Sequence, residues 1–180
     1  MKKLGFVFNA ARCNGCGACA IACKAEKGVP DDVWMRRRME NPHHLTYLSM
    51  GCAHCEHPAC LEACPVKAYR KEADGLVLQD HAKCIGCKAC VTACPYGVPA
   101  YSEADKKVHK CDGCAARLAK GLAPACVAAC PMGALEFGPI EALRAKYPEA
   151  VVKGFEWAAE DFRMPSPDKT KPNLVIVPLS

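Results

Sequence analysis

The stretch CIGCKACVTACP, residues 84–95, carries four cysteines at short and regular intervals. Two residues lie between its first and second cysteines, two between the second and third, and three between the third and fourth. A tight backbone loop with these gaps can wrap four thiolates around one metal centre. The proline that follows fixes φ and removes a backbone donor, so it ends the short helix that carries the last two cysteines. The stretch therefore predicts a metal centre held by thiolates.

Three further groups of four cysteines share this arrangement, and together the four groups use all sixteen cysteines of the chain. The first group has the same gaps, whereas the second and fourth lengthen the gap before their third cysteine. The spacing C-x2-C-x2-C-x3-C-P holds a [4Fe–4S] cluster in bacterial ferredoxins. We therefore expect four [4Fe–4S] clusters, with these cysteines as ligands: Cys13, Cys16, Cys19 and Cys23; Cys52, Cys55, Cys60 and Cys64; Cys84, Cys87, Cys90 and Cys94; Cys111, Cys114, Cys126 and Cys130.

Two other uses of so many cysteines fit the spacing less well. Disulfides suit secreted scaffolds, but two cysteines separated by two residues cannot easily bridge to each other without strain. Zinc sites also use such pairs, but they rarely add a third cysteine after two residues and a fourth after three, with proline next. The spacing thus favours iron–sulfur clusters over both alternatives.

Charge and motif content exclude several classes of function. The formal net charge is +5 with neutral thiols. Four clusters with roughly two negative charges each would bring it to about −3, so the basic excess does not indicate a nucleic-acid partner. No Ser–His–Asp set, phosphate-binding loop or carboxylate pair stands out, so we expect no catalytic residue and no small-molecule substrate of its own. No apolar run is long enough for a membrane helix, and the first residues do not resemble a secretory signal.

Short strands and helices are expected between the cysteine groups, which gives an α+β fold class. The stretches KLGFVFN, TYLSM, GLVLQ, KKVHK and GALEFG predict strands, and the run ADG at residues 73–75 predicts a hairpin turn. After Pro139, the segment IEALRAKYP predicts an amphipathic helix. The tail is rich in Pro, Lys and Asp and contains the extended segment NLVIVP, so we expect it to lie on another molecule.

Taken together, these motifs resemble the four-cluster electron-transfer subunits of the dimethyl sulfoxide reductase type, in the molybdopterin oxidoreductase superfamily. The resemblance runs from Phe6 through the tail, and the stretched fourth group and LEFGPIEALR are its most specific parts. It is carried by RCNGCGACAIACK, CAHCEHPACLEACP, KCIGCKACVTACPYGVPAY, KCDGCAARLAKGLAPACVAACP, ALEFGPIEALRAKYP and KPNLVIVP. It implies a pair of bacterial-ferredoxin-like units related by pseudo-symmetry, and a role in electron transfer without catalysis.

The resemblance also implies how the units divide the chain. The first unit would comprise residues 1–50 and 95–147, with an insertion at 26–49. The second unit, residues 51–94, would be inserted in the first, and residues 148–180 would form an extended C-terminal arm.

The sharing of clusters between groups follows from this division. In two-cluster ferredoxins the fourth cysteine of one run ligates the cluster of the other run. Spacing alone permits pairing of consecutive groups, whereas the resemblance favours nesting, in which the first group pairs with the fourth and the second with the third. The expected ligand sets are then Cys13, Cys16, Cys19 and Cys130; Cys111, Cys114, Cys126 and Cys23; Cys52, Cys55, Cys60 and Cys94; Cys84, Cys87, Cys90 and Cys64.

Partners and location are implied by the resemblance alone. Similar subunits pass electrons between a quinone-reactive membrane anchor and a large molybdopterin catalytic subunit. The implied location is the periphery of the bacterial cytoplasmic membrane, on its outer face after co-export with a signal-bearing partner; the cytoplasmic face or the cytoplasm is the alternative. A free-standing soluble polyferredoxin is the alternative function.

A few other side chains have more than one interpretation. His54 and His57 lie within the second group, and because the cysteines already supply every ligand we expect both histidines to form loop hydrogen bonds. Residues 36–38, all arginine, have three interpretations: they dock a partner's acidic face, they are a solvated surface run, or they alternate along a strand. His81 is a candidate for tuning the potential of the third group's cluster or for lying near a quinone pocket.

Overall fold

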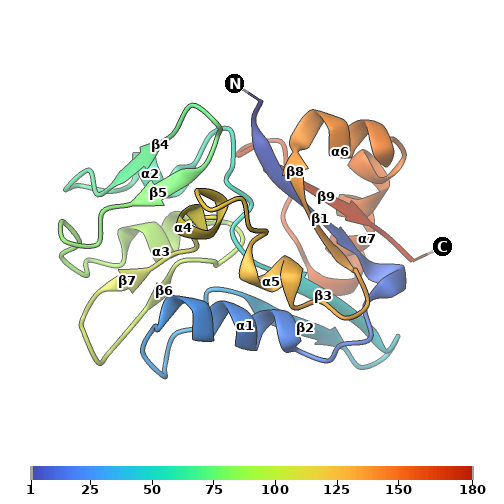
Figure 1. The fold of residues 1–180 in the computed structure, drawn as a ribbon, viewed down its shortest axis with the longest axis horizontal. Helices are drawn as coiled ribbons and strands as arrows, with labels where there is room; N and C mark the ends of the chain where they lie inside the picture. Colours follow the sequence, from blue (N-terminus) through green and yellow to red (C-terminus); the bar gives the residue numbers. More distant parts are fainter. Residues whose placement is uncertain (1, 180) are drawn as a thin grey trace.

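The computed structural model describes residues 2–179, and its largest sheet has three strands in the order β8-β1-β9 (Figure 1). β1 (Leu4–Asn9) is the central strand; β8 (Leu135–Pro139) pairs with it antiparallel and β9 (Leu174–Val177) parallel. Two-stranded hairpins lie outside this sheet: β2 (Arg37–Asn41) with β3 (Thr46–Met50), β4 (Tyr69–Lys71) with β5 (Val77–Gln79), and β6 (Ala100–Tyr101) with β7 (Val108–His109). The mixed helix and short-strand fold confirms the α+β class.

β1 is buried on both faces, which explains its nearly continuous apolar sequence. Val7 packs on one face against Ile140 and Leu143 of α6 (Ile140–Lys146). Phe6 and Phe8 point to the other face and join the largest apolar core. Burying each phenylalanine stabilises the fold by roughly 1.5–3 kcal/mol, so this sheet has an apolar core of its own.

Each cysteine group places a short helix at the same point, one residue before its third cysteine. These helices are α1 (Ala18–Lys27), α2 (Ala59–Glu62), α3 (Ala89–Ala93) and α5 (Ala125–Ala128). Proline follows the last cysteine of the second, third and fourth groups, and α2, α3 and α5 are only four or five residues long. Lys24 follows the first group instead, and α1 continues for ten residues. Helices are thus short where proline follows the fourth cysteine and long where lysine follows it. Proline has no backbone N–H to donate, so a helix cannot continue through it without losing a hydrogen bond.

The groups also resemble one another in pairs. Gly17 and Lys88 precede α1 and α3, and both have left-handed backbone conformations, with φ of 77° and 62°. Pro58 and Pro124 precede α2 and α5. The first group thus matches the third and the second matches the fourth, as two pseudo-symmetric units would require. The helix α4 (Ala115–Leu118) occupies the long gap of the fourth group.

The C-terminal segment folds back onto the chain itself. α7 (Ala150–Phe162) packs on β9, where Gly154 leaves room for the backbone of Ile176. β9 is extended, as expected, but the expectation that it lies on another molecule is wrong. Val175 and Ile176 are 1% and 0% exposed because β9 pairs with β1 inside the central sheet.

The segment before β9 connects the sheet to the second cysteine group. The amides of Glu56 and His57 donate to the carbonyls of Lys171 and Thr170, at 2.8 and 3.0 Å. The Asn173 side chain donates to the His54 carbonyl at 2.8 Å. These bonds fix the loop of the second group against the right-hand sheet of Figure 1.

Within residues 2–179, no helix combines the length and the apolar character that crossing a bilayer requires.

Candidate cluster-binding sites

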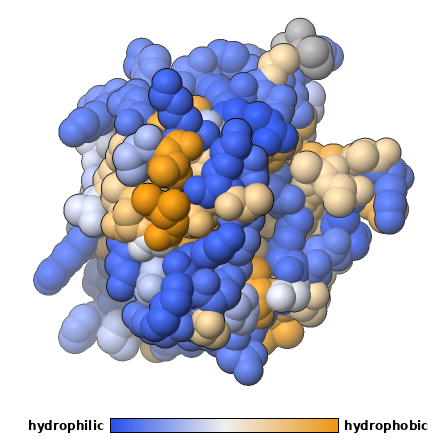
Figure 2. All heavy atoms as spheres, turned by 90° about the vertical axis from the view of Figure 1, so that its left-hand side faces the viewer, coloured by the Kyte–Doolittle hydropathy of each residue, from blue (hydrophilic) through white to orange (hydrophobic). Residues whose placement is uncertain are grey.

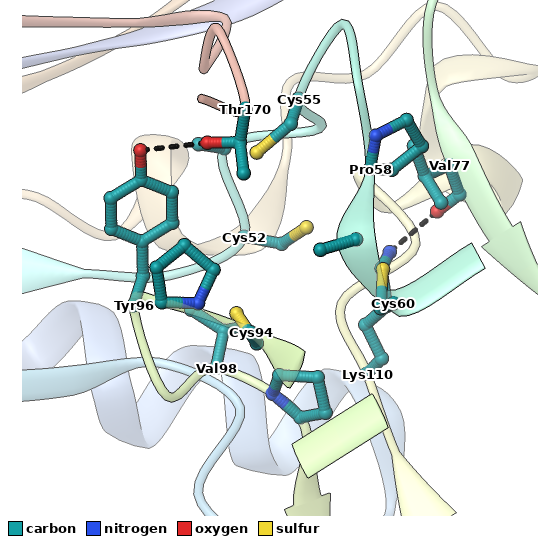
Figure 3. Close-up of a pocket in the computed structure, with 14 residues that line it drawn as sticks. Cys52, Cys55, Pro58, Cys60, Val77, Cys94, Tyr96, Val98, Lys110 and Thr170 are labelled. Carbon is teal, nitrogen blue, oxygen red and sulfur yellow. Dashed lines mark hydrogen bonds between the residues drawn. The ribbon is translucent and has the colours of Figure 1, made fainter. Parts of the chain in front are cut away.

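One cavity is lined by three cysteines of the second group and the last cysteine of the third (Figure 3). Apolar side chains such as Val77 and Val98 form much of its remaining wall. The four thiols, which converge on this space, are those of Cys52, Cys55, Cys60 and Cys94.

A second cavity has the corresponding composition in the other half of the molecule. Its walls include Phe8, Leu135 and Ser49, and the Ser49 hydroxyl lies 3.1 Å from the Cys19 sulfur. Three of its cysteines come from the first group and one from the fourth: Cys13, Cys16, Cys19 and Cys130.

The remaining cysteines also gather across group boundaries. Burial, with smaller contributions from Cys84 and Cys64, raises the pKa of Cys90, so these thiols from the second and third groups are neighbours. Burial and then the charge of Cys126 raise the pKa of Cys23 to about 11, with Cys114 contributing less. Burial, then the charge of Cys52 and, less strongly, those of Cys23 and Cys126 raise the pKa of Cys111. Cys64 of the second group thus lies with Cys84 and Cys90 of the third, and Cys23 of the first group lies with cysteines of the fourth.

The cavities are chemically suited to a cationic metal centre. Burial, followed by the charge of Cys52, raises the pKa of Cys55 and of Cys60 to about 12. Thiols in such surroundings stay protonated unless positive charge is supplied, and a metal centre supplies it as the protons leave. Apolar walls and converging thiols thus fit an iron–sulfur cluster and do not fit a reactive nucleophile.

Backbone amides point at the cysteine sulfurs in a repeated pattern. The amide two residues later donates to Cys52 at 3.4 Å and to Cys111 at 3.4 Å. The amide four residues later donates to Cys64 at 3.3 Å and to Cys130 at 3.2 Å. Donors aimed at sulfur stabilise thiolates and help to set a cluster's potential. The second and fourth groups therefore provide the same surroundings for sulfur.

A buried hydroxyl gives an independent test of the fit. Tyr69 packs beside Cys60 and Cys90, and among the described residues its hydroxyl oxygen meets no partner in ordinary hydrogen-bond geometry. Burial, followed by a weaker contact of the hydroxyl with the Cys90 thiol, raises the pKa of Tyr69, so the phenol retains its proton. The sulfurs of a bound cluster and of its cysteine ligands would accept a hydrogen bond from the Tyr69 hydroxyl. The residues around Tyr69 therefore fit an iron–sulfur cluster.

The four gatherings form a series through the molecule. We call the sets containing Cys52 and Cys111 the inner sets, and those containing Cys13 and Cys84 the outer sets. Arg36 lies among sulfurs of the Cys13 and Cys111 sets. Lys110 lies among those of the Cys111 and Cys52 sets. The two sets at the other end meet where Cys60 and Cys90 share one apolar cluster.

Buried cationic and polar side chains surround the inner sets. The Lys110 ammonium donates to the Val77 carbonyl at 2.5 Å (Figure 3) and to the Cys111 carbonyl at 2.6 Å. Although burial opposes its charge, the thiols of the Cys52 and Cys111 sets raise the pKa of Lys110. Arg36, 4% exposed, donates to the carbonyl and hydroxyl of Ser49. Arg36 is therefore not a docking residue, because β2 begins one residue later and leaves it in the interior.

His54 makes the loop hydrogen bonds expected of it and reaches the other inner set as well. Its Nδ1 accepts from the Val77 amide at 2.9 Å, which leaves the proton of a neutral ring on Nε2. That Nε2 lies 3.9 Å from the Cys111 sulfur.

The sequence analysis did not predict that Arg36 and Lys110 belong to the site. The signals in the sequence that could have indicated them were their positions: Arg36 directly precedes a strand, and Lys110 directly precedes Cys111.

The outer sets open to solvent. Cys16 and Cys87 are exposed, whereas the inner sets have no exposed cysteine. Figure 2 shows the left-hand face of Figure 1, which is largely hydrophilic with scattered small areas of apolar surface. In the third group Ile85, two residues before Cys87, is 63% exposed.

Two family models match this sequence, both described as a 4Fe–4S dicluster domain, at residues 43–140 and 8–68. The sequence is 41% identical to the B subunit of anaerobic dimethyl sulfoxide reductase from Escherichia coli K12, over 98% of this protein and 89% of the relative. It is 34% identical to the B subunit of polysulfide reductase from Wolinella succinogenes, over 98% and 95%. It is 39% identical to the thiosulfate reductase electron transfer subunit of Salmonella typhi, over 72% of each protein.

Proposed function

Because the chain belongs to the iron–sulfur electron-transfer subunits of the dimethyl sulfoxide reductase type, we propose that it relays electrons between a quinone-reactive membrane anchor and a molybdopterin catalytic subunit. It does so by holding four [4Fe–4S] clusters and has no substrate site of its own. When bound, such clusters supply one-electron transfer over a wide range of potentials. The observation that carries this proposal is the pair of cysteine cavities, each lined by three cysteines of one group and the last of another.

The proposed ligands are the sixteen cysteines in the nested sets. Two sets are supported by the cavities and two by the mutual effects of their thiols on pKa. The division into a first unit at residues 1–50 and 95–147 and an inserted second unit at 51–94 is part of the same proposal. It is supported by the matching helix starts and amide contacts of the second and fourth groups.

The chain's own residues perform three tasks in this role. Thiolates hold the clusters, and amide donors and Tyr69 hydrogen-bond to sulfur. Lys110 and Arg36 place positive charge beside the inner sets, which favours the reduced and more negative state. Cys16 and Cys87 lie at exposed ends of the series, where partners can approach for electron entry and exit.

The proposed location is the periphery of the bacterial cytoplasmic membrane, on the outer face after co-export with a signal-bearing catalytic partner. The cytoplasmic face is the alternative. Family membership supports a complex, because the relatives' names describe components of reductases.

The experiment is anaerobic purification of the tagged chain from its native host, followed by metal and sulfide analysis. The proposal expects about sixteen irons and sixteen sulfides per chain, together with a co-purifying molybdenum subunit. Purified alone, the chain should exchange electrons with dyes and reduce no sulfoxide. About eight irons per chain, or sulfoxide reduction without molybdenum, would contradict it.

A soluble polyferredoxin is the second candidate function, and one observation favours it. The apolar tail segment is buried in the chain's own sheet, so it does not require a partner. A monomer that carries its full iron content and shows normal electron transfer in its host without a molybdenum subunit would favour this carrier.

A further inference from the structure

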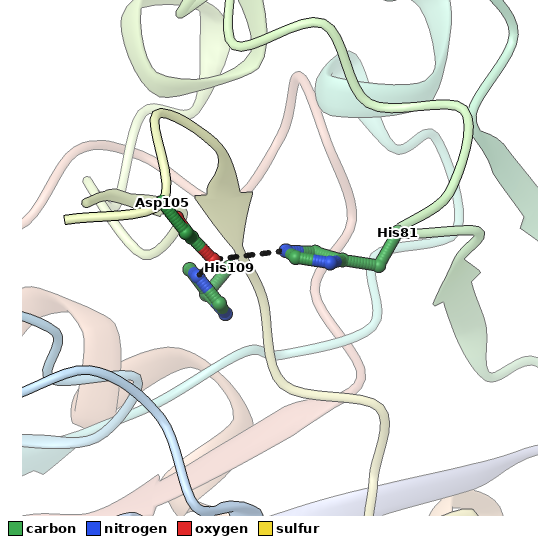
Figure 4. Close-up of side chains that lie close together, drawn as sticks. All are labelled: His81, Asp105 and His109. Carbon is green, nitrogen blue, oxygen red and sulfur yellow. Dashed lines mark hydrogen bonds and ion pairs between the residues drawn. The ribbon is translucent and has the colours of Figure 1, made fainter. Parts of the chain in front are cut away.

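A second group of metal-binding side chains lies outside the cysteine sets. His81, Asp105 and His109 converge at the edge of the β6–β7 hairpin (Figure 4). One ligand atom from each residue lies within 4.8 Å of the other two. None of the three belongs to a cysteine group, and the proposed electron relay does not use them.

The backbone already aims the carboxylate at both imidazoles. Asp105 lies in the turn between β6 and β7, and its Oδ1 accepts from the Lys107 amide at 3.1 Å. Its Oδ2 is therefore free to face His109 Nε2 at 2.8 Å and His81 Nε2 at 3.9 Å. The two imidazole rings lie against each other with centroids 4.5 Å apart.

His81 has an unexplained buried nitrogen. Its Nε2 is inaccessible to solvent and has no hydrogen-bond partner among residues 2–179. The 3.9 Å that separates it from Asp105 Oδ2 is too long for a hydrogen bond. Buried polar atoms are almost always satisfied, so this nitrogen indicates a group that the protein alone does not supply.

We propose that His81, Asp105 and His109 bind one divalent transition-metal ion of the zinc class. The ligands are Nε2 of each histidine and Oδ2 of the aspartate, and water completes the coordination. Ligand atoms on a tetrahedral zinc ion lie about 3.3 Å apart at zinc–ligand distances of about 2.0–2.2 Å. The observed 2.8 and 3.9 Å lie on either side of that value, so small side-chain rotations close the site.

The choice of ion follows from the donor atoms. Two imidazoles and one carboxylate suit zinc and its neighbours, whereas calcium and magnesium prefer oxygen ligands alone. The nearby lysines do not fill the position: the Lys107 ammonium donates to the His81 carbonyl at 3.0 Å, and Lys106 pairs with Glu103.

The ion would clamp two segments that are weakly held otherwise. β6 and β7 have two residues each, and His81 lies in the loop that leads to Cys84. The Val108 amide, next to His109, is 3.5 Å from the Cys84 sulfur. Metal at this site therefore fixes the hairpin against the loop that enters the third group, and its role is structural.

The test uses oxidised, cluster-loaded protein purified anaerobically and dialysed against Zn²⁺ at a series of concentrations. Zinc, iron and sulfide per chain are measured together, so that zinc uptake is separated from replacement of cluster iron. The wild type should retain one zinc with all iron in place. His81→Asn and Asp105→Asn should each weaken binding about tenfold or more, and His43→Asn, at an exposed histidine remote from the site, should not.

Anomalous diffraction at the zinc edge supplies the location. A peak among the three side chains supports the site, whereas a peak on a cysteine set overturns it. Equal zinc affinity in wild type and both variants, or no retained zinc in the wild type, also overturns it. If His81→Asn loses cluster iron, zinc affinity is compared between the wild type and Asp105→Asn alone. Asp105→Glu, which keeps the carboxylate, should recover part of the zinc affinity.

Discussion

The inner and outer cysteine sets have the same ligands but different surroundings. Around the inner sets lie a buried lysine, a buried arginine and a buried histidine, and no inner cysteine is exposed. The outer sets have one exposed cysteine each, Cys16 and Cys87. Among residues 2–179, the one buried cation beside an outer set is Arg36, which the Cys13 set shares with the Cys111 set. The comparison teaches that identical ligands can be given different surroundings: in the proposed relay, the middle of the series is where potentials would be tuned, and the ends are where partners would approach.

The largest expected effect is the loss of one outer cluster. Cys64→Ser removes the proposed fourth ligand of the set that contains Cys84, although Cys64 belongs to the second group in sequence. We expect one altered or missing signal in electron paramagnetic resonance and a loss of up to about four irons. The inner set of Cys52, Cys55 and Cys60 should keep its signal. If that inner signal disappears and the outer one stays, the nested pairing is wrong.

A smaller effect is expected when the buried charge is removed. Lys110→Met keeps the length of the side chain and deletes a cation beside both inner sets. Without it the reduced states are less stable, so both inner potentials should fall by an amount on the order of 100 mV. The outer potentials should move much less. Redox titration followed by electron paramagnetic resonance measures all four, and Lys120→Met, at an exposed site, is the control. An equal shift of all four potentials would contradict the prediction that Lys110 acts on the inner sets and not on the outer sets.

Hydrogen bonding to one sulfur should have a weaker effect than a full charge. His54→Asn can still accept from the Val77 amide but cannot reach the Cys111 sulfur. We expect the potential of the Cys111 set to fall by some tens of millivolts, since a lost donor no longer stabilises the reduced cluster. His54→Gln, which has the longer reach, should restore part of the shift. Equal shifts in both variants would show that His54 acts by packing alone.

The smallest effect should come from an ion pair at the surface, where water screens charge. Lys3 and then Lys71 hydrogen-bond to Glu56 and lower its pKa to about 2. Because the folded pKa lies below the ordinary value, this stability is present above about pH 4.5 and is lost as the pH falls towards 2. Glu56→Gln should cost about 1 kcal/mol at pH 7, or roughly 2–4 °C in the temperature of cluster bleaching. The gap from the wild type should stay nearly constant down to about pH 4.5 and narrow as the pH falls from there towards 2; a gap that stays constant over that lower range would show that the charge is not responsible.

Local patterns predicted much of the fold. The strands at Thr46–Met50 and Leu135–Pro139 and the helix after Pro139 were expected from short apolar or amphipathic stretches, and the structure has them. The cysteine spacing indicated where helices begin, because loop, helix and proline lie within one short segment. Family membership and the 4Fe–4S domains confirm the cofactor class.

Contacts between distant segments were harder to predict. The partner of Leu174–Val177 is β1, more than 160 residues earlier, and no local pattern encodes that pairing. Arg36 is in a run of three arginines that sequence alone describes as surface, but its neighbour in space is Ser49. Lys110 is buried because two cysteine groups meet around it. Each of these depends on which segments the fold brings together, and the clusters and the central sheet decide that.

The central position of β1 has a consequence for synthesis on the ribosome. β1 is translated long before its two partner strands, which are made from residues 135–139 and 174–177. A nascent chain therefore exposes both edges of an apolar strand until residues 135–139 have been made and one edge until residues 174–177 follow, and open edges of this kind attract aggregation and proteolysis. A chain that lacks residues 174–177 leaves β1 unpaired on one side. β9 is thus the strand that closes the sheet, and one edge of β1 stays open until β9 has been made.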